Sequence, residues 1–380
     1  MHRSALFFAL AIIFVSIPVQ FGVADELPEK IRDEIRTKVE ELQESKGIPG
    51  ISVAVGVNDK LAYEFALGQA DVEHSVPAKT TTRYRSASIA KTMTAVAIFS
   101  LVEDGKLDLD AEVQDYCPDY PTKKWPVTTR QVLGHLGGVR HYKSAAEARA
   151  TGHFFTLQAA LATFKDDPLI HEPGTKYRYS SFGFNLLGSV AEGAAEQPFL
   201  FLLNERVFKP AGMEFTVADD QYNIVPDRAK GYIRPSLADT IQLGGLGILL
   251  PSKLYNAPLH DTSMKIPGGG LRSTAGDLIR FAVAVNSDAL LTPESKATIW
   301  TGQKTTDGTE TGYGLGWSVG ELNGEKRVSH SGGQSGTSTY LLMLPESGIC
   351  VAIMCNLQSV GLSGLAQEIA TLIPIPNNSQ

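Results

Sequence analysis

The sequence has little of several features that define whole classes of proteins. Only three cysteines, Cys117, Cys350 and Cys355, occur among 380 residues. So small and odd a number excludes a disulfide framework, and no group of Cys and His has the spacing of a zinc site. We expect no metal and no other cofactor. We expect the cysteines to be buried, with Cys350 and Cys355 on opposite faces of one strand.

Clustered positive charge is also missing. Lys and Arg number 34 against 41 Asp and Glu, so the formal net charge is -7. Because phosphate binding requires grouped Lys and Arg, a nucleic-acid partner is not expected. Hydrophobic residues make up 43% and charged residues 20%, which is typical of a globular protein. No internal repeat and no low-complexity linker divides the sequence.

Two common active-site patterns are absent. Residues 333–336 do not form the Gly-x-Ser-x-Gly elbow of a Ser-His-Asp hydrolase. Residues 268–270 are three glycines without the downstream Lys and Ser or Thr of a phosphate-binding loop. Neither a triad hydrolase of that type nor a phosphate-binding loop is therefore indicated.

The N-terminus has the layout of a secretory signal peptide. His2 and Arg3 give a short basic start, residues 6–19 are apolar, and small residues at 22–24 precede Asp25. This arrangement predicts a signal peptide over residues 1–24 and a secreted or periplasmic protein. The apolar stretch is short for a membrane span, although an uncleaved anchor remains an alternative. No later stretch is long enough to cross a bilayer.

Strand patterns lie near both ends of the chain, and mostly helical patterns lie between them. Two hairpins are expected near the C-terminus, around turns at residues 322–325 and 345–348. We expect an α/β fold of the α+β type, in which one antiparallel sheet is built from both termini, flanked by helices, with a mostly helical subdomain beside it. The other predicted elements are helices at 29–46, 88–103 and 361–372 and strands at 51–57, 61–67, 316–320, 326–330, 337–344 and 349–356.

These patterns predict a single domain over residues 25–373. Its α/β part comprises about residues 25–87 and 301–373, its helical part about 88–300, and residues 374–380 form a tail. The stretch at 237–261, which includes an apolar, glycine-rich segment, has no assigned structure or role. A cleft between two such halves is a common place for a binding site.

The chain has one Ser-x-x-Lys motif, formed by Ser88 and Lys91 at the head of a long apolar run. If Ser88 opens a helix, the two side chains lie on one face, and a helix that is apolar on all sides is buried. Burial lowers the pKa of an amine, so Lys91 could be the base that makes Ser88 a nucleophile. The alternative is an ordinary buried helix with a capping serine and a lysine that extends to the surface.

Tyr179, Ser180 and Ser181 precede a helical pattern over residues 182–194. Either serine could cap this helix, and in an extended chain Tyr179 and Ser181 point the same way. A phenol can relay a proton if nearby cations lower its pKa. The alternative is a tyrosine packed in a loop beside a capping serine.

The segment His330-Ser331-Gly332-Gly333 follows one expected strand and opens the next. Small residues let a substrate backbone lie close, and the imidazole and hydroxyl could hold a carboxylate or a carbonyl. Histidine titrates near neutrality, so we expect substrate affinity to change between about pH 5 and 8. The alternative is a glycine-rich turn with an exposed histidine. For His135, which ends a short helix begun near Thr128, we expect a structural role because nothing beside it in the sequence is catalytic.

The order and spacing of three motifs resemble the serine beta-lactamase and penicillin-binding protein superfamily. They are Ser88-Ile89-Ala90-Lys91, Tyr179-Ser180-Ser181 and His330-Ser331-Gly332. The likeness is to the class C branch, which includes D-Ala-D-Ala carboxypeptidases, esterases and mitochondrial serine beta-lactamase-like peptidases. Further stretches at 135–142, 268–278 and 313–317 support it, and it covers about residues 49–356.

The resemblance implies a beta-lactamase/transpeptidase-like fold and a role for each motif. Ser88 is the acylated nucleophile, Lys91 takes its proton or tunes the base, and Tyr179 carries protons to the leaving group. Backbone amides of Ser88 and Gly333 form the oxyanion hole, which typically contributes a few kcal/mol. Residues expected to bind the substrate, a small molecule or a peptide, are Ser181, His330, Ser331 and Gly332.

Two departures from the family pattern bear on the substrate. The class C motif Tyr-x-Asn has Ser181 in its third position here, and the usual Lys-Thr-Gly is replaced by His330-Ser331-Gly332. Both changes weaken the case for efficient beta-lactam hydrolysis. The resulting hypothesis is a secreted serine hydrolase of the peptidase or D,D-carboxypeptidase type, with an esterase or beta-lactamase as the alternative. A module that binds cell-wall peptides or beta-lactams without turnover is the alternative from another class.

Overall fold

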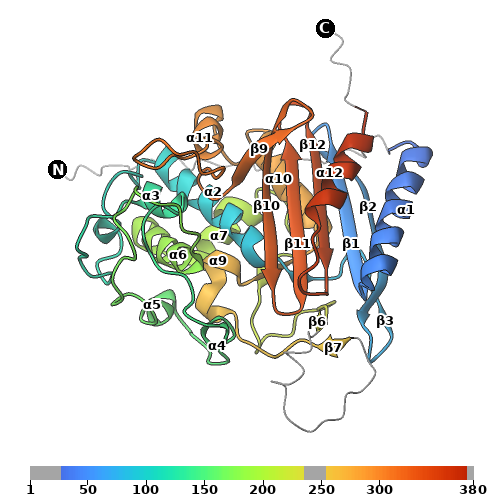
Figure 1. Ribbon diagram of the computed structural model, residues 1–380, viewed down its shortest axis with the longest axis horizontal. Coiled ribbons are helices and arrows are strands. Elements are labelled where there is room, and N and C mark those ends of the chain that lie inside the picture. The colour runs from blue at the N-terminus through green and yellow to red at the C-terminus, as the bar shows by residue number, and fades with distance from the viewer. Residues whose placement is uncertain (1–26, 235–253, 375–380) are drawn as a thin grey trace, which may run out of the picture.

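The fold is built on a seven-stranded sheet in which strands from both ends of the chain lie side by side (Figure 1). The computed structural model describes residues 27–234 and 254–374. The expected signal peptide, nearly all of the tail and most of the stretch at 237–261 lie outside the described residues.

The strand order β3-β2-β1-β12-β11-β10-β9 places the N-terminal strands beside the C-terminal ones. Strands β1 and β12 pair antiparallel, with Ile51 opposite Cys355, so the predicted sheet of both termini is confirmed. The strand bounds are β1 Gly50–Val57, β2 Lys60–Asp71, β3 Val76–Pro77, β9 Ser318–Leu322, β10 Glu325–Gln334, β11 Thr337–Leu344 and β12 Ile349–Cys355.

The central strands are buried on both faces because helices cover each side. Helices α1 (Glu29–Lys46) and α12 (Ser363–Leu372) lie together on the outer face of the sheet. Alternation along β12 sends Val351 and Cys355 into the core beneath these two helices, and Cys350 and Ala352 into the core on the other face. All three cysteines are free and buried, as the sequence predicts.

The inner face is covered first by α10 (Ala275–Asn286), which packs on β1, β2 and β12. This helix lies within the residues expected to form the helical part, so the expected division at 88–300 does not follow the packing. Beyond α10 lie α2 (Ala90–Glu103) and α6 (Ser181–Ala195), which contact each other. Their meeting place is where the candidate catalytic residues gather.

The predicted strand at 316–320 begins two residues later than expected, at Ser318. Gly316 has a φ of 87°, and a Cβ there would lie 2.6 Å from the Cβ of Ala95. The chain is therefore pressed against α2 at this point, and only glycine fits both the backbone angle and the space.

Short helices and two small sheets complete the part of the chain that the structure describes. The order β4-β8-β5 forms a three-stranded sheet, and β6 pairs with β7. None of the helices within 27–234 and 254–374 has the length and apolar character needed to span a membrane. The bounds are β4 Tyr84–Arg85, α3 Thr129–Leu133, α4 Ala145–Ala148, α5 Leu157–Leu161, α7 Phe199–Leu203, β5 Val217–Ala218, β6 Tyr232–Ile233, β7 Tyr255–Asn256, α9 Ile266–Gly269, β8 Leu271–Ser273 and α11 Pro293–Ile299.

Candidate active site

Ser88 lies in a tight turn between β4 and α2. The turn is a single 3-10 segment, Ala87–Ile89, and it leads directly into the helix. Ala87 is fully buried with a φ of 48°, a left-handed backbone that costs about 1 kcal/mol or more in a residue other than glycine. Ser88 is half-buried while its neighbours are fully buried. The turn therefore leaves Ser88 accessible, and its side chain does not cap the helix.

Lys91 is fully buried one turn after Ser88. Its Nζ lies 3.1 Å from the Oγ of Ser88, 3.2 Å from the Oγ of Ser181 and 2.5 Å from the carbonyl oxygen of Gly268. Burial, reinforced by the charge of Lys265, lowers the pKa of Lys91 well below its usual value. The alternative of a lysine that extends to the surface is therefore wrong.

Ser180 and Ser181 have separate tasks at the start of α6. Ser180 is the N-cap: its Oγ accepts a hydrogen bond from the backbone N–H of Gly183 at 2.9 Å and donates one to the carbonyl of Arg140 at 2.7 Å. Ser181 is the first helical residue, and its Oγ faces Lys91. Because Ser180 caps the helix, the hydroxyl of Ser181 can contact Lys91 instead.

Tyr179 completes the group around the nucleophile. Its hydroxyl is hydrogen-bonded to Ser88, and its ring centroid lies 5.0 Å from the Nζ of Lys91. Burial nevertheless raises the pKa of Tyr179 above its usual value. The condition that nearby cations lower this pKa is not met, because burial decides its direction. The two pKa directions favour a protonated phenol beside a neutral amine.

Two histidines lie behind the Tyr179–Ser181 segment. The Nδ1 of His135 accepts the backbone N–H of Ser180 at 3.2 Å, and the Nδ1 of His141 accepts that of Ser181 at 3.1 Å. The His135 ring is buried, with its centroid 4.3 Å from that of Tyr179. Burial and the charge of Lys91 lower the pKa of His135, so its ring is neutral and its Nδ1 can accept the hydrogen bond from Ser180.

The structural role expected for His135 includes a ring contact with Tyr179 that the sequence does not reveal. The predicted helix end is confirmed in position but differs in detail. Helix α3 begins after Thr128, whose side chain forms a capping box with Gln131, and it ends at Leu133. The left-handed residue that turns the chain is His135 itself, with a φ of 58°, and this turn aims the ring into the site.

His330 faces the same group from strand β10. Its Nε2 lies 2.9 Å from the hydroxyl of Tyr313 and its Nδ1 lies 2.7 Å from the carbonyl oxygen of Ser331. Burial, together with the charge of Lys91, lowers the pKa of His330 to about 3. The ring is therefore buried rather than exposed, and this pKa lies below the range of about pH 5 to 8 in which a pH-dependent affinity through His330 is expected.

The structure separates the remaining residues of this motif. Strand β10 continues to Gln334, so the motif lies inside a strand rather than in a turn. A Cβ at Gly332 would lie 2.6 Å from the carbonyl oxygen of Ser86, so glycine lets β10 pack against the Ser88 turn. Ser331 is exposed, and alternation sends its side chain to the face opposite His330, in a hollow beside Leu362. It is not brought to Ser88.

Gly333 is exposed, and the edge of β10 on which it lies is free of strand β9. Strand β9 pairs with β10 only as far as Ser329. Strand β10 also packs against the Ser88 turn. This free edge is where a backbone N–H of Gly333 could meet a substrate carbonyl, as an oxyanion hole requires.

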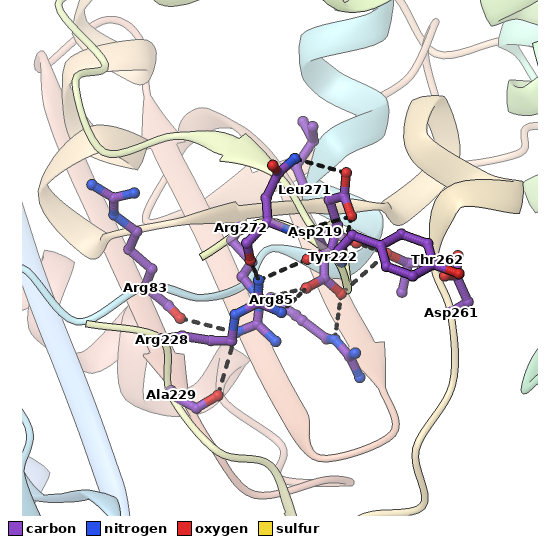
Figure 2. A network of polar contacts seen from close by, with 12 residues as sticks. Arg83, Arg85, Asp219, Tyr222, Arg228, Ala229, Asp261, Thr262, Leu271 and Arg272 are labelled. Atoms are coloured by element: carbon purple, nitrogen blue, oxygen red, sulfur yellow. Dashed lines mark hydrogen bonds and ion pairs between the residues drawn. The ribbon is translucent and has the colours of Figure 1, made fainter. Parts of the chain in front are cut away.

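A buried aspartate lies among arginines beside β4, the strand that leads into the Ser88 turn (Figure 2). Asp219 accepts from the Nε of Arg85 at 2.6 Å and from the Nε of Arg272, and Arg228 lies 3.7 Å away. Burial raises the pKa of Asp219, but the charges of Arg272 and Arg85 outweigh it and lower this pKa far below its usual value. We call these four residues the Asp219 cluster. It fixes β4, which ends three residues before Ser88.

Sequence reasoning missed several residues of this site, including Gly268, Tyr313 and His141. Gly268 and Tyr313 lie in stretches that support the family resemblance, but no local pattern assigns them a role. Among the described residues, one group of His, Asp and Glu could hold a metal ion, and it lies away from this site: Asp71, Glu73 and His74. It lies at the β2–β3 end of the sheet, where Lys230 already pairs with Glu73.

A family model described as Beta-lactamase matches residues 35–370. The chain belongs to this family. It is 30% identical to the human serine beta-lactamase-like protein LACTB, mitochondrial, over 88% of this chain and 78% of that protein. It is 28% identical to penicillin-binding protein 4* of Bacillus subtilis, over 82% and 68%. The octameric penicillin-binding protein homologue from Pyrococcus abyssi superposes with a TM-score of 0.75 at 25% identity, over 90% and 77%.

Membership confirms the beta-lactamase/transpeptidase-like fold and identifies the protein as a serine hydrolase of the beta-lactamase and penicillin-binding protein superfamily. The three motifs that carry the resemblance meet at one place in the structure. Of the predicted site residues, those gathered there are Ser88, Lys91, Tyr179, Ser181, His330 and Gly332.

Proposed function

We propose that the protein hydrolyses amide bonds of peptide-like substrates through an acyl-enzyme on Ser88. The observation that carries this proposal is the pair of Lys91 and Ser88: a fully buried amine lies 3.1 Å from a half-buried hydroxyl. Among the described residues, no carboxylate forms an ion pair with Lys91 to hold its proton in place. A neutral amine at this distance is a competent general base.

The first half of the reaction forms the ester. The Ser88 proton passes to Lys91 as Oγ bonds to the substrate carbonyl carbon, and the oxyanion accepts hydrogen bonds from the N–H groups of Ser88 and Gly333. Collapse breaks the C–N bond, and Tyr179 gives its proton to the leaving nitrogen. The proton on Lys91 then restores the phenol, so no charge accumulates.

Hydrolysis of the ester uses the same groups in reverse. Water loses a proton to the neutral Lys91 and attacks the acyl carbon, and the bond from that carbon to the Oγ of Ser88 breaks to release a carboxylic acid. Ser88 recovers its proton. Amide hydrolysis is placed first because an amine leaves only when it is protonated, and Tyr179, whose raised pKa keeps it protonated, is hydrogen-bonded to Ser88.

The nucleophile is tested by labelling with a fluorophosphonate and with a penicillin, followed by peptide mass spectrometry. We expect an adduct on Ser88 with at least one reagent and none in Ser88→Ala. Ser100→Ala is the matched control, because Ser100 lies in the helix that follows the Ser88 turn and its hydroxyl donates to the carbonyl of Ala97. Absence of any Ser88 adduct in the folded protein would contradict the proposal.

The substrate class is tested with a panel of D-amino-acid peptides, short-chain esters and a chromogenic cephalosporin. Amide turnover that exceeds ester turnover supports a peptidase or D,D-carboxypeptidase, whereas dominant ester or cephalosporin turnover identifies the esterase or beta-lactamase alternative. Beta-lactamase activity ranks below peptidase activity as a candidate because Ser181 has a hydroxyl where class C enzymes have an amide. A stable adduct without turnover of any substrate identifies a binding module.

We also propose that the protein acts outside the cytoplasm after removal of residues 1–24. The support is the sequence pattern of that segment alone. N-terminal sequencing of the protein from its native host tests this, with a start near Asp25 expected and a start at Met1 as the contrary result.

A further inference from the structure

A second buried lysine lies close to the nucleophile and has no part in the reaction described above. Lys265 ends the 3-10 segment Ser263–Lys265 and is only 5% exposed. Its Nζ donates to the carbonyl of Ala148 at 2.7 Å and lies 5.4 Å from the ring centroid of Tyr142. Within the described residues it has no ion-pair partner. A buried ammonium held by a carbonyl and an aromatic face keeps an uncompensated positive charge.

Two routes connect this ammonium to Lys91. Through side chains, Lys265 faces Tyr142, the hydroxyl of Tyr142 bonds to Ser181, and Ser181 bonds to Lys91. Through the backbone, the carbonyl that Lys91 contacts belongs to Gly268, three residues after Lys265. The same segment therefore gives the catalytic lysine a hydrogen-bond acceptor and places a positive charge near it.

We propose that Lys265 is a positioning residue of the Ser88 site, whose ammonium adds to burial in favouring the neutral form of Lys91 and so moves the lower limit of catalysis to lower pH. This rests on the proposed function, since it assumes that Lys91 is the base. Two like charges in a poorly solvated place repel each other. The proton is therefore driven from Lys91, which is the more deeply buried of the two.

The charged groups around both lysines are consistent with this assignment. Burial lowers the pKa of Lys265 to about 8, with Arg85 lowering it and Asp219 and Asp261 raising it. Lys265 therefore remains mostly protonated at pH 7. The other titratable groups that face the pair are four histidines with lowered pKa values and two tyrosines with raised ones, together with one further arginine: His135, His141, His260, His330, Tyr142, Tyr179 and Arg149.

The sign of the effect follows directly. Lys91 must be neutral to accept the Ser88 proton, so activity is lost as the pH falls through the pKa of Lys91. Removal of the Lys265 charge raises that pKa toward its ordinary value. The acid limb of the rate profile then moves to higher pH, and the shift is largest where Lys265 carries its full charge, below about pH 8.

The test is the rate of Ser88 labelling by a fluorophosphonate between about pH 4 and 10, with wild type, Lys265→Met and Lys265→Arg. We expect the acid limb of Lys265→Met to move upward by at least about half a pH unit and that of Lys265→Arg to stay near wild type. The matched control is Lys123→Met, because Lys123 also donates to a backbone carbonyl, that of Asp167, and lies 4.8 Å from the ring centroid of Tyr120.

Three outcomes are distinguishable. No Ser88 labelling in wild type refutes the proposed function itself. Labelling with an unmoved acid limb in folded Lys265→Met refutes the role of Lys265, even if the rate falls, because loss of packing lowers the rate at every pH. Tyr142→Phe separates the two routes: it removes the hydrogen bond to Ser181 but keeps the charge, so a lower rate with an unmoved limb is expected. If Lys265→Met does not fold, a displaced limb in Lys265→Arg would also overturn the proposal.

Discussion

The Asp219 cluster and the Ser88 site are neighbours in the chain, since Arg85 of the cluster lies three residues before Ser88. They differ in whether a buried charge has an opposite charge beside it. In the Asp219 cluster, the carboxylate is 2% exposed and contacts guanidinium groups from three arginines. Around Ser88, a fully buried lysine contacts two hydroxyls and a carbonyl, with no carboxylate paired to it among the described residues. The cluster keeps its ions because each has an opposite charge beside it, whereas the site neutralises its lysine.

The difference shows how one fold supports both rigidity and reactivity. Paired charges in the Asp219 cluster anchor β4, and β4 ends where the Ser88 turn begins. Next to that turn lies Lys91, whose amine has hydrogen bonds but no carboxylate partner among the described residues. Variants that remove either the amine or the paired carboxylate test this comparison.

Removal of the unpaired amine should have the largest effect. Lys91→Ala deletes the base, so we expect labelling of Ser88 to slow by about 10²- to 10⁴-fold, as loss of a general base usually does. The measurement is the pseudo-first-order rate with a fluorophosphonate. Because no buried charge is left unpaired, the thermal midpoint should change far less than in the next variant. Near-normal labelling would contradict the role of Lys91 as base.

Removal of the paired carboxylate should act on stability. Asp219→Asn leaves the buried Arg272 and the partly buried Arg85 and Arg228 without their counter-charge, and we expect a loss of about 3 to 5 kcal/mol in the free energy of unfolding. Denaturant titration measures it. Asp110→Asn is the control, because the Asp110 side chain is 63% exposed in its pair with Arg130 and should cost less than about 1 kcal/mol. Equal losses in the two variants would refute the contrast.

Removal of the acceptor behind the site should give a smaller effect. His135→Phe keeps a ring against Tyr179 but leaves the N–H of Ser180 unpaired, and we expect kcat to fall about tenfold. His135→Asn should restore part of it, because asparagine offers an acceptor and tolerates the left-handed φ of 58°. Similar kcat values in the two variants, despite different melting temperatures, would limit His135 to a structural role.

The smallest effect concerns His330, where we expect none. Since its pKa is lowered to about 3, the ring stays neutral from about pH 5 to 8. Plots of KM against pH for wild type and His330→Gln should therefore have the same shape in that range. A step near pH 6.5 in wild type alone would mean that the imidazole is charged when substrate binds.

The sequence was sufficient where local pattern and burial agree. The Ser88–Lys91 spacing, the continuous apolar run and the strand patterns at both ends predicted the contact of Ser88 with Lys91, the buried amine and the sheet built from both termini. The Tyr179–Ser181 segment was predicted in place, and Ser180 is the cap. These features depend on neighbours within a few residues, and such neighbours are visible in a single chain.

The parts that sequence did not predict depend on packing between distant segments. The pKa values of His330 and Tyr179 were expected to respond to charge, but burial decides both. His135 gave no sign of its contact with Tyr179, because the two are 44 positions apart and joined only by the fold. Lys265 was passed over for the same reason: nothing beside it in sequence is catalytic.

The pairing of β1 with β12 also has a consequence for how the protein is made. A ribosome that adds about 5 to 20 residues per second completes β12 roughly 15 to 60 s after β1. Through that interval the first hairpin has no neighbour on its inner edge, and the Ser88 turn has no β10 against which to settle. The active site is therefore complete only near the end of synthesis, and we expect any fragment that ends before β10 to be inactive.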